Sequence, residues 1–147
     1  MKNKVILLVE DSPRDETLTL RTLSKANVVN EIVVIRDGAE ALDYLFATGK
    51  YDGRDAADLP EVLLLDLKLP KVDGLQILER LRANESTMQL PVVVFTSSSE
   101  QEDKVRSSVG GANSYVRKPI AFEQFAEATR QLGIHWLLLN QTPPIEY

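Results

Sequence analysis

Five side chains that can bind a metal or a phosphate stand at the ends of short apolar runs of the chain. They are Glu10 and Asp11 after residues 5–9, Asp66 after 62–65, Thr96 after 91–95 and Lys118 after 114–116. Three carboxylates brought close together repel one another and raise each other's pKa, unless a cation lies among them. Mg²⁺ suits such a set, because it binds a few carboxylates together with water and substrate oxygens. The pattern therefore predicts a magnesium site.

The remaining members of the set indicate what such a metal would be used for. The ammonium of Lys118 can hold a phosphoryl oxygen as a point charge, and the hydroxyl of Thr96 can donate a hydrogen bond to the same group. Asp66 stands alone at the end of its run and is the candidate nucleophile, because aspartate forms acyl phosphates. Glu10 and Asp11 follow a different run and are suited to holding the metal. Together these residues predict magnesium-dependent phosphoryl transfer onto Asp66.

The elements that must position these residues alternate along the chain. Continuous apolar runs predict buried strands at 5–9, 32–35, 62–65, 91–95 and 114–116. Between them, apolar residues at helical spacing predict a helix from Pro13 with Ser12 as its N-cap, helices near 41–46 and 75–81, a short helix within 97–111 and a last helix over 122–136. Residues 48–59 are polar and predict a surface loop. This alternation predicts an α/β fold, a doubly wound five-stranded parallel sheet whose ligands bind at the carboxyl ends of the strands.

Composition narrows the class of protein. A chain of 147 residues fits one domain, and the absence of cysteine excludes disulfides and cysteine-based zinc sites. The net charge of −5 disfavours nucleic acid as a direct partner. We find no signal peptide and no apolar stretch near the ~20 residues that span a bilayer, so we expect a cytoplasmic protein without membrane contact.

Four blocks of the sequence resemble the receiver domain of two-component response regulators. They are LLVEDS, LLLDLKLPKVDG around Asp66, VVFTSS around Thr96, and YVRKP. The separations also agree, at 66 − 11 = 55, 96 − 66 = 30 and 118 − 96 = 22 residues. The resemblance extends over residues 4–132 and implies a flavodoxin-like receiver fold with strand order 2-1-3-4-5.

The resemblance also implies a role for each residue of the set. Asp66 would accept a phosphoryl group from a phosphohistidine on a sensor histidine kinase. The implied Mg²⁺ ligands are Asp11 directly, Glu10 through water, Asp66, and the backbone carbonyl of Lys68. Lys118 and Thr96 would contact the phosphoryl oxygens, and Lys118-Pro119 resembles the family's usual cis peptide.

Two further roles are implied by position. Tyr115 matches the switch aromatic of the family, which turns inward when Thr96 moves toward the phosphate. Lys68 and Ser98, two residues after Asp66 and Thr96, occupy positions that tune dephosphorylation. The expected protein therefore catalyses its own phosphorylation and dephosphorylation and has no small-molecule metabolite to turn over.

The insert before the third strand and the end of the chain resemble those of small regulators paired with bacterial phytochromes. A bacteriophytochrome is therefore one candidate for the partner kinase, and we expect a receiver domain over 1–139 with a tail over 140–147. Large apolar residues in succession cannot all face one side of a helix, so they predict a homodimer unless residues 143–147 fold back over them. The predicted dimer surface consists of Trp136, Leu137, Leu138 and Leu139.

Taken singly, Asp11 could cap the following helix, Thr96 could bond the backbone and Lys118 could be a surface lysine. A flavin carrier of the same sheet order would need a phosphate-binding loop where Glu10 and Asp11 stand. A dehalogenase-like enzyme would need a second aspartate where Lys68 stands, and a nucleotide-binding P-loop motif is absent. The alternative that stays open is an interaction module with the receiver fold that is never phosphorylated.

Overall fold

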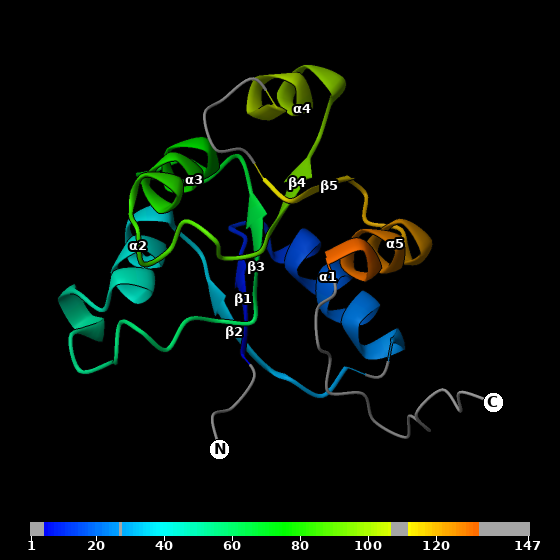
Figure 1. The fold of residues 1–147 in the computed structure, drawn as a ribbon. Helices are drawn as coiled ribbons and strands as arrows, with labels where there is room; N and C mark the ends of the chain where they lie inside the picture. The colour runs from blue at the N-terminus through cyan, green and yellow to red at the C-terminus, as the bar shows by residue number, and fades with distance from the viewer. Residues whose placement is uncertain (1–4, 27, 107–111, 133–147) are drawn as a thin grey trace.

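Five parallel strands form the centre of the molecule, in the order β2-β1-β3-β4-β5 (Figure 1). The computed structural model describes residues 5–26, 28–106 and 112–132. The strands are β1 (Val5–Val9), β2 (Glu31–Ile35), β3 (Val62–Asp66), β4 (Val92–Thr96) and β5 (Ser114–Arg117). The helices are α1 (Pro13–Lys25), α2 (Gly38–Phe46), α3 (Gly74–Ala83), α4 (Ser99–Arg106) and α5 (Phe122–Leu132). The predicted doubly wound fold and its strand order are confirmed.

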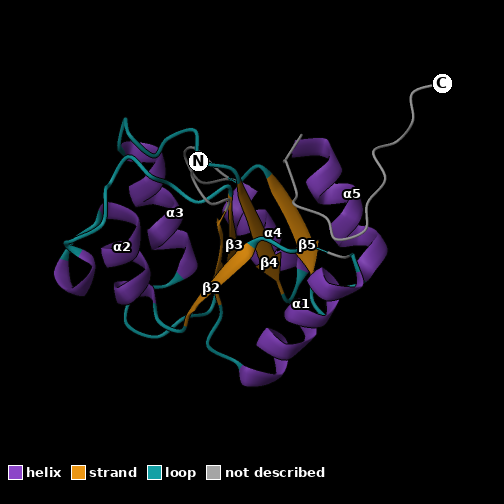
Figure 2. Ribbon diagram, turned by 90° about the horizontal axis from the view of Figure 1, so that it is seen from below, coloured by secondary structure: helices purple, strands orange, loops and turns teal. Residues whose placement is uncertain are grey.

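Helices cover both faces of the sheet. In the two ribbon views α1 and α5 lie together on one side, and α2 and α3 lie on the other (Figures 1 and 2). The central strands β1, β3 and β4 are therefore buried on both faces, which explains why their sequences are uninterrupted apolar runs rather than alternating ones.

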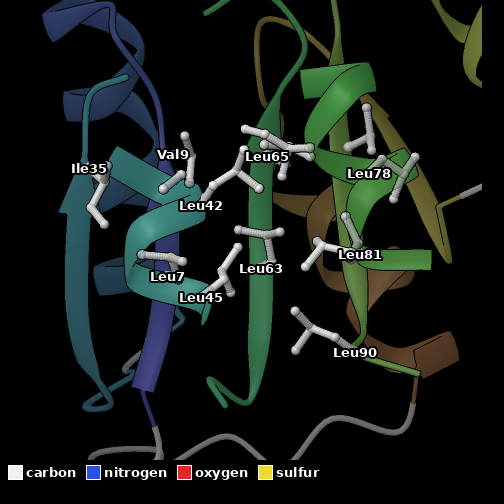
Figure 3. Packing of buried hydrophobic residues seen from close by; sticks show 14 of the residues in the cluster. Leu7, Val9, Ile35, Leu42, Leu45, Leu63, Leu65, Leu78, Leu81 and Leu90 are labelled. Atoms are coloured by element: carbon white, nitrogen blue, oxygen red, sulfur yellow. The ribbon is translucent and has the colours of Figure 1, made fainter. Parts of the chain in front are cut away.

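Successive residues of each central strand point into two separate hydrophobic cores, because side chains alternate between the two faces of a sheet. Leu7, Leu63 and Leu65 point to the core beneath α2 and α3, where they meet Leu42 and Leu81 (Figure 3). The opposite core is made by Ile6, Leu8, Leu23, Leu64, Phe95 and Phe125 with their neighbours. Two apolar cores thus hold the strands rigid and leave their carboxyl ends as the place where polar side chains collect.

The insert between α2 and β3 is more ordered than the predicted surface loop. It contains a short 3₁₀ turn, η1 (Gly49–Tyr51), that packs against α2. The ring of Tyr51 meets that of Tyr44 edge-on, with centroids 5.1 Å apart, and the guanidinium of Arg54 lies 4.0 Å from the Tyr44 ring centroid. The polar composition of the insert did not predict this packing, because it is formed by aromatic and cationic side chains and not by a run of apolar residues.

The end of the chain lies outside the described residues. The structure describes α5 as far as Leu132, so Trp136, Leu137, Leu138 and Leu139 and the tail over 140–147 stay predictions. Within the described part of the chain, the helices are all too short or too polar to cross a membrane.

Candidate functional site

The sheet brings the predicted residues to one edge. Val9 pairs with Leu65 in the register of β1 and β3, so the residues that follow β1 lie beside Asp66 at the end of β3. Ligand oxygens of Glu10, Asp11 and Asp66 all lie within 4.8 Å of one another. The expected carboxylate cluster is therefore formed, with one buried acid from each of two adjacent strands and the exposed Asp11 at its rim.

Lys118 reaches the same cluster from the position directly after β5. Its Nζ atom lies 3.1 Å from Oε1 of Glu10 and 3.3 Å from Oδ1 of Asp66, and its side chain is 12% exposed. The peptide bond between Lys118 and Pro119 is cis, as the resemblance implied. The backbone N–H of Lys118 donates to the carbonyl of Thr96 at 2.7 Å, which continues the pairing of β4 with β5 by one residue. The lysine is thus fixed to the strand that carries the threonine.

Thr96 contributes a hydroxyl that lacks an acceptor in the part of the chain that the structure describes. It is fully buried at the end of β4, and its Oγ1 atom has no hydrogen-bond partner among the described residues. A buried hydroxyl without a partner costs free energy, so such groups are uncommon unless a ligand completes them. This orphaned donor fits a bound group with oxygen acceptors, such as a phosphoryl group.

The charges of the cluster do not balance. Burial, together with the negative charge of Asp66, raises the pKa of Glu10 from 4.5 to about 7, although Lys118 acts in the opposite direction. Burial alone would lower the pKa of Lys118, but hydrogen bonding to Asp15 and the charges of Asp66 and Glu10 raise it above its ordinary value. One ammonium serves several carboxylates, so the donor set fits a hard divalent cation with oxygen ligands.

Asp15 belongs to the site and was missed by the sequence reasoning. Its Oδ2 atom lies 2.8 Å from Nζ of Lys118. It stands in the first turn of α1, which begins right at the sheet edge because Ser12 caps it by accepting a hydrogen bond from the N–H of Asp15. This cap also decides against Asp11 as the helix cap. The available signal was the spacing of Asp11 and Asp15, four residues apart where a helix starts at a site.

The loop after β3 is closed tightly over the end of that strand. A Cβ atom on Gly74 would lie 2.4 Å from the backbone oxygen of Asp66, so only glycine allows α3 to begin there. Asp73 caps α3 in a reciprocal arrangement with Gln76. Lys68 lies exposed in this loop, and with Asp11 it lines a hollow of 570 Å³ that opens beside the cluster.

The two other predicted residues lie on the side of Thr96 that faces α4. Tyr115 on β5 is partly buried, and the guanidinium of Arg106 lies 4.2 Å from its ring centroid. Ser98 caps the start of α4, where its Oγ accepts from the N–H of Gln101 at 3.2 Å. The proposed switching and dephosphorylation roles stay predictions, but both residues contact α4.

Sequence relatives extend over nearly the whole chain. The probable methanogenesis regulatory protein FilR2 of Methanothrix harundinacea is 36% identical over 139 residues, which are 95% of this chain and 87% of that protein. The response regulator Rcp1 of Synechocystis is 34% identical over 134 residues, which are 91% of this chain and 89% of Rcp1.

Solved structures agree with the fold. The bacteriophytochrome response regulator RtBRR is 49% identical with a TM-score of 0.87, over 97% of this chain and 86% of that one. The bacteriophytochrome response regulator AtBRR is 51% identical with a TM-score of 0.85, over 96% of this chain and 100% of that one. The Mn²⁺-bound form of Rcp1 is 33% identical with a TM-score of 0.72, over 96% of this chain and 99% of that one. Residues 6–130 match the response regulator receiver domain, and the chain is therefore a member of that family.

Proposed function

We propose that the protein accepts a phosphoryl group from a sensor histidine kinase onto Asp66 in a magnesium-dependent phosphorelay. The observation that carries the proposal is the combination, at one sheet edge, of a three-carboxylate cluster, a largely buried lysine and a buried threonine hydroxyl that has no partner among the described residues. Receiver domains are signalling proteins that bind Mg²⁺ in an acidic pocket, which agrees with this use. A purely passive interaction module would have no need for the buried charges, which are costly to desolvate.

The transfer itself requires little covalent chemistry from the protein. A carboxylate oxygen of Asp66 attacks phosphorus, the new P–O bond forms as the P–N bond of the phosphohistidine breaks, and the imidazole leaves with the electron pair. Asp11, Glu10 and the backbone carbonyl of Lys68 would hold Mg²⁺ together with Asp66. When bound, the ion neutralises the charge that develops on the transferring group.

Lys118 and Thr96 would complete the binding of the phosphoryl oxygens. The ammonium is already 3.3 Å from the Asp66 carboxylate, and the threonine hydroxyl is a donor without an acceptor among the residues that the structure describes. Thr96 would move toward the phosphate and Tyr115 would turn inward behind it. The phosphoryl group would then be removed by the protein's own hydrolysis, at a rate set in part by Lys68 and Ser98.

The proposed partner kinase is a bacteriophytochrome. Two bacteriophytochrome response regulators of known structure are about half identical to this chain over nearly its full length, which supports the assignment. We also propose a homodimer through Trp136, Leu137, Leu138 and Leu139, which lie outside the described residues. Sedimentation of wild type and of Leu138→Glu checks this proposal, and equal molar masses at the monomer value would contradict it.

Phosphorylation is tested by electrophoresis in Phos-tag gels after incubation with acetyl phosphate and Mg²⁺. We expect a shifted band for wild type, no shifted band for Asp66→Asn, and no shifted band in EDTA. Asp52→Asn is the matched control, since it removes an exposed aspartate of the insert and should leave the shift unchanged. A wild-type protein that never shifts, with acetyl phosphate or with phosphorylated kinase, would favour the unphosphorylated interaction module instead.

A further inference from the structure

We propose that Asp15 is a positioning residue that holds the ammonium of Lys118 in line with Asp66. The inference rests on the proposed function, because it assigns Lys118 to the phosphoryl oxygens. It adds an acid that lies outside the metal-binding cluster, comes from a helix rather than from a strand end, and touches the lysine alone among the site residues whose contacts are described.

The contacts of Lys118 carry the proposal. The shortest is to Oδ2 of Asp15 at 2.8 Å, followed by Oε1 of Glu10 at 3.1 Å and Oδ1 of Asp66 at 3.3 Å. A lysine ammonium has three N–H donors. Asp15 and Glu10 accept hydrogen bonds from the ammonium, which leaves one donor for Asp66, 3.3 Å away, where the phosphoryl group would form.

A tether of this kind has a physical purpose. A lysine side chain has considerable rotamer freedom, and an ammonium that samples many positions cannot stabilise a transferring group efficiently. Glu10 is an unreliable anchor, because its oxygens are shared with the metal cluster. Asp15 is not part of that cluster, so its hold on Lys118 persists whether or not a cation is bound.

The position of Asp15 is itself well determined. Ser12 fixes the first turn of α1 by accepting the N–H of Asp15, and Ser12 also donates its own N–H to Oε2 of Glu10. The carboxylate therefore approaches Lys118 from the rigid start of a helix. Its side chain is 27% exposed, so replacement by asparagine should leave folding intact.

The experiment compares Asp15→Asn with Glu16→Gln in the full-length protein. The control removes the same charge one residue along, from an acid that pairs with Arg36 at 2.9 Å rather than with Lys118. The first measurement is the ¹H–¹⁵N signal of the Lys118 ammonium in the unphosphorylated protein, assigned by its loss in Lys118→Arg. The second is the rate of phosphorylation by acetyl phosphate with saturating Mg²⁺.

We expect Asp15→Asn to lose the protected ammonium signal and to slow phosphorylation roughly tenfold, the lower range for removing the partner of a site residue. Glu16→Gln should keep the signal and match the wild-type rate or exceed it slightly. Asp15→Glu, which restores the charge on a longer side chain, should recover part of the rate. An Asp15→Asn protein that keeps the signal, or loses it but is phosphorylated as fast as Glu16→Gln, would overturn the positioning role.

Failure of this inference can be told apart from failure of the proposed function. If wild type is phosphorylated but Asp15→Asn behaves as Glu16→Gln does, only the positioning role fails. If wild type is never phosphorylated, the proposed function fails with its dependent rate prediction, and the positioning role is overturned as well.

Discussion

Two glutamates of this protein have pKa values shifted in opposite directions. Glu10 is fully buried at the sheet edge, and burial beside Asp66 raises its pKa to about 7. Glu40 lies on α2, where a hydrogen bond from the hydroxyl of Tyr51, 2.6 Å long, lowers its pKa below 4.5 with help from Lys50. The same type of side chain is thus destabilised in its charged form in one region and stabilised in the other.

The difference separates a site from a scaffold. Around the insert, donors and acceptors are matched: Tyr51 and Lys50 serve Glu40, and Arg54 serves the backbone oxygens of Tyr44 and Asp58. At the sheet edge, by contrast, Glu10, Asp15 and Asp66 share the ammonium of Lys118, and the hydroxyl of Thr96 has no partner within the described ranges. A region in which every charge and hydrogen-bonding group is paired stabilises the fold. A region with unpaired groups is stabilised further when a ligand binds to them.

The largest expected effect is a dependence of metal-free stability on pH. Because the pKa of Glu10 is about 7 in the folded protein and its ordinary value is 4.5, its contribution to stability is fully present below pH 4.5 and is lost as pH rises through 7. The free energy of unfolding in EDTA should fall by about 3 kcal/mol between pH 5 and pH 8 from this group. Urea denaturation at both pH values measures it.

The matched variant for this effect is Glu10→Gln, which mimics the protonated acid. Its metal-free stability should change much less over the same interval, and added Mg²⁺ should raise wild-type stability at pH 8 without raising that of the variant comparably. Parallel pH profiles for wild type and variant in EDTA would show that the sheet edge carries no excess charge.

Two glycines provide a second contrast between the regions. Gly74→Ala places Cβ against the backbone of Asp66 and Leu67, which cannot yield, so we expect a loss of about 2 kcal/mol together with slower phosphorylation. Gly49 in the insert has φ of +57°, and an added Cβ there would meet the movable side chain of Asp43. For Gly49→Ala we therefore expect a loss of stability of about 1 kcal/mol and no change in phosphorylation. Thermal unfolding and Phos-tag kinetics of both variants measure the pair, and equal effects on phosphorylation would contradict it.

The smallest expected effect concerns the insert. Tyr51→Phe removes the hydroxyl that donates to Glu40 and should cost about 1 kcal/mol at pH 7. Because the pKa of Glu40 is lowered, this contribution is present above pH 4.5 and is lost as pH falls through the lowered value. A double-mutant cycle with Glu40→Gln at pH 7 and pH 3 checks it; a coupling free energy that is equal at both pH values would refute the assignment.

The strand ends could be predicted because apolar runs in a parallel sheet stop at a common edge. That rule predicts that Glu10, Asp66, Thr96 and Lys118 lie at one edge of the sheet, which is where the structure has them. The rule does not predict Asp15, because the contact of Asp15 with Lys118 depends on the direction in which α1 leaves the sheet. The pattern of apolar runs carries no information on that direction. The packing of Tyr51 on Tyr44 escaped for a related reason, since single aromatic residues in a polar segment give no periodic signal.

The hydrogen bond from the N–H of Lys118 to the carbonyl of Thr96 has a consequence for how sequences of this kind can vary. It means that strand register, and not the number of intervening residues, keeps Lys118 beside Thr96. Insertions or deletions between Arg106 and Ala112 should therefore be tolerated better than loss of Asn113, which is hydrogen-bonded to Val92. Removing one residue within β5 would turn its side chains to the opposite face. Length variation among homologues should accordingly be frequent before this strand and rare within it.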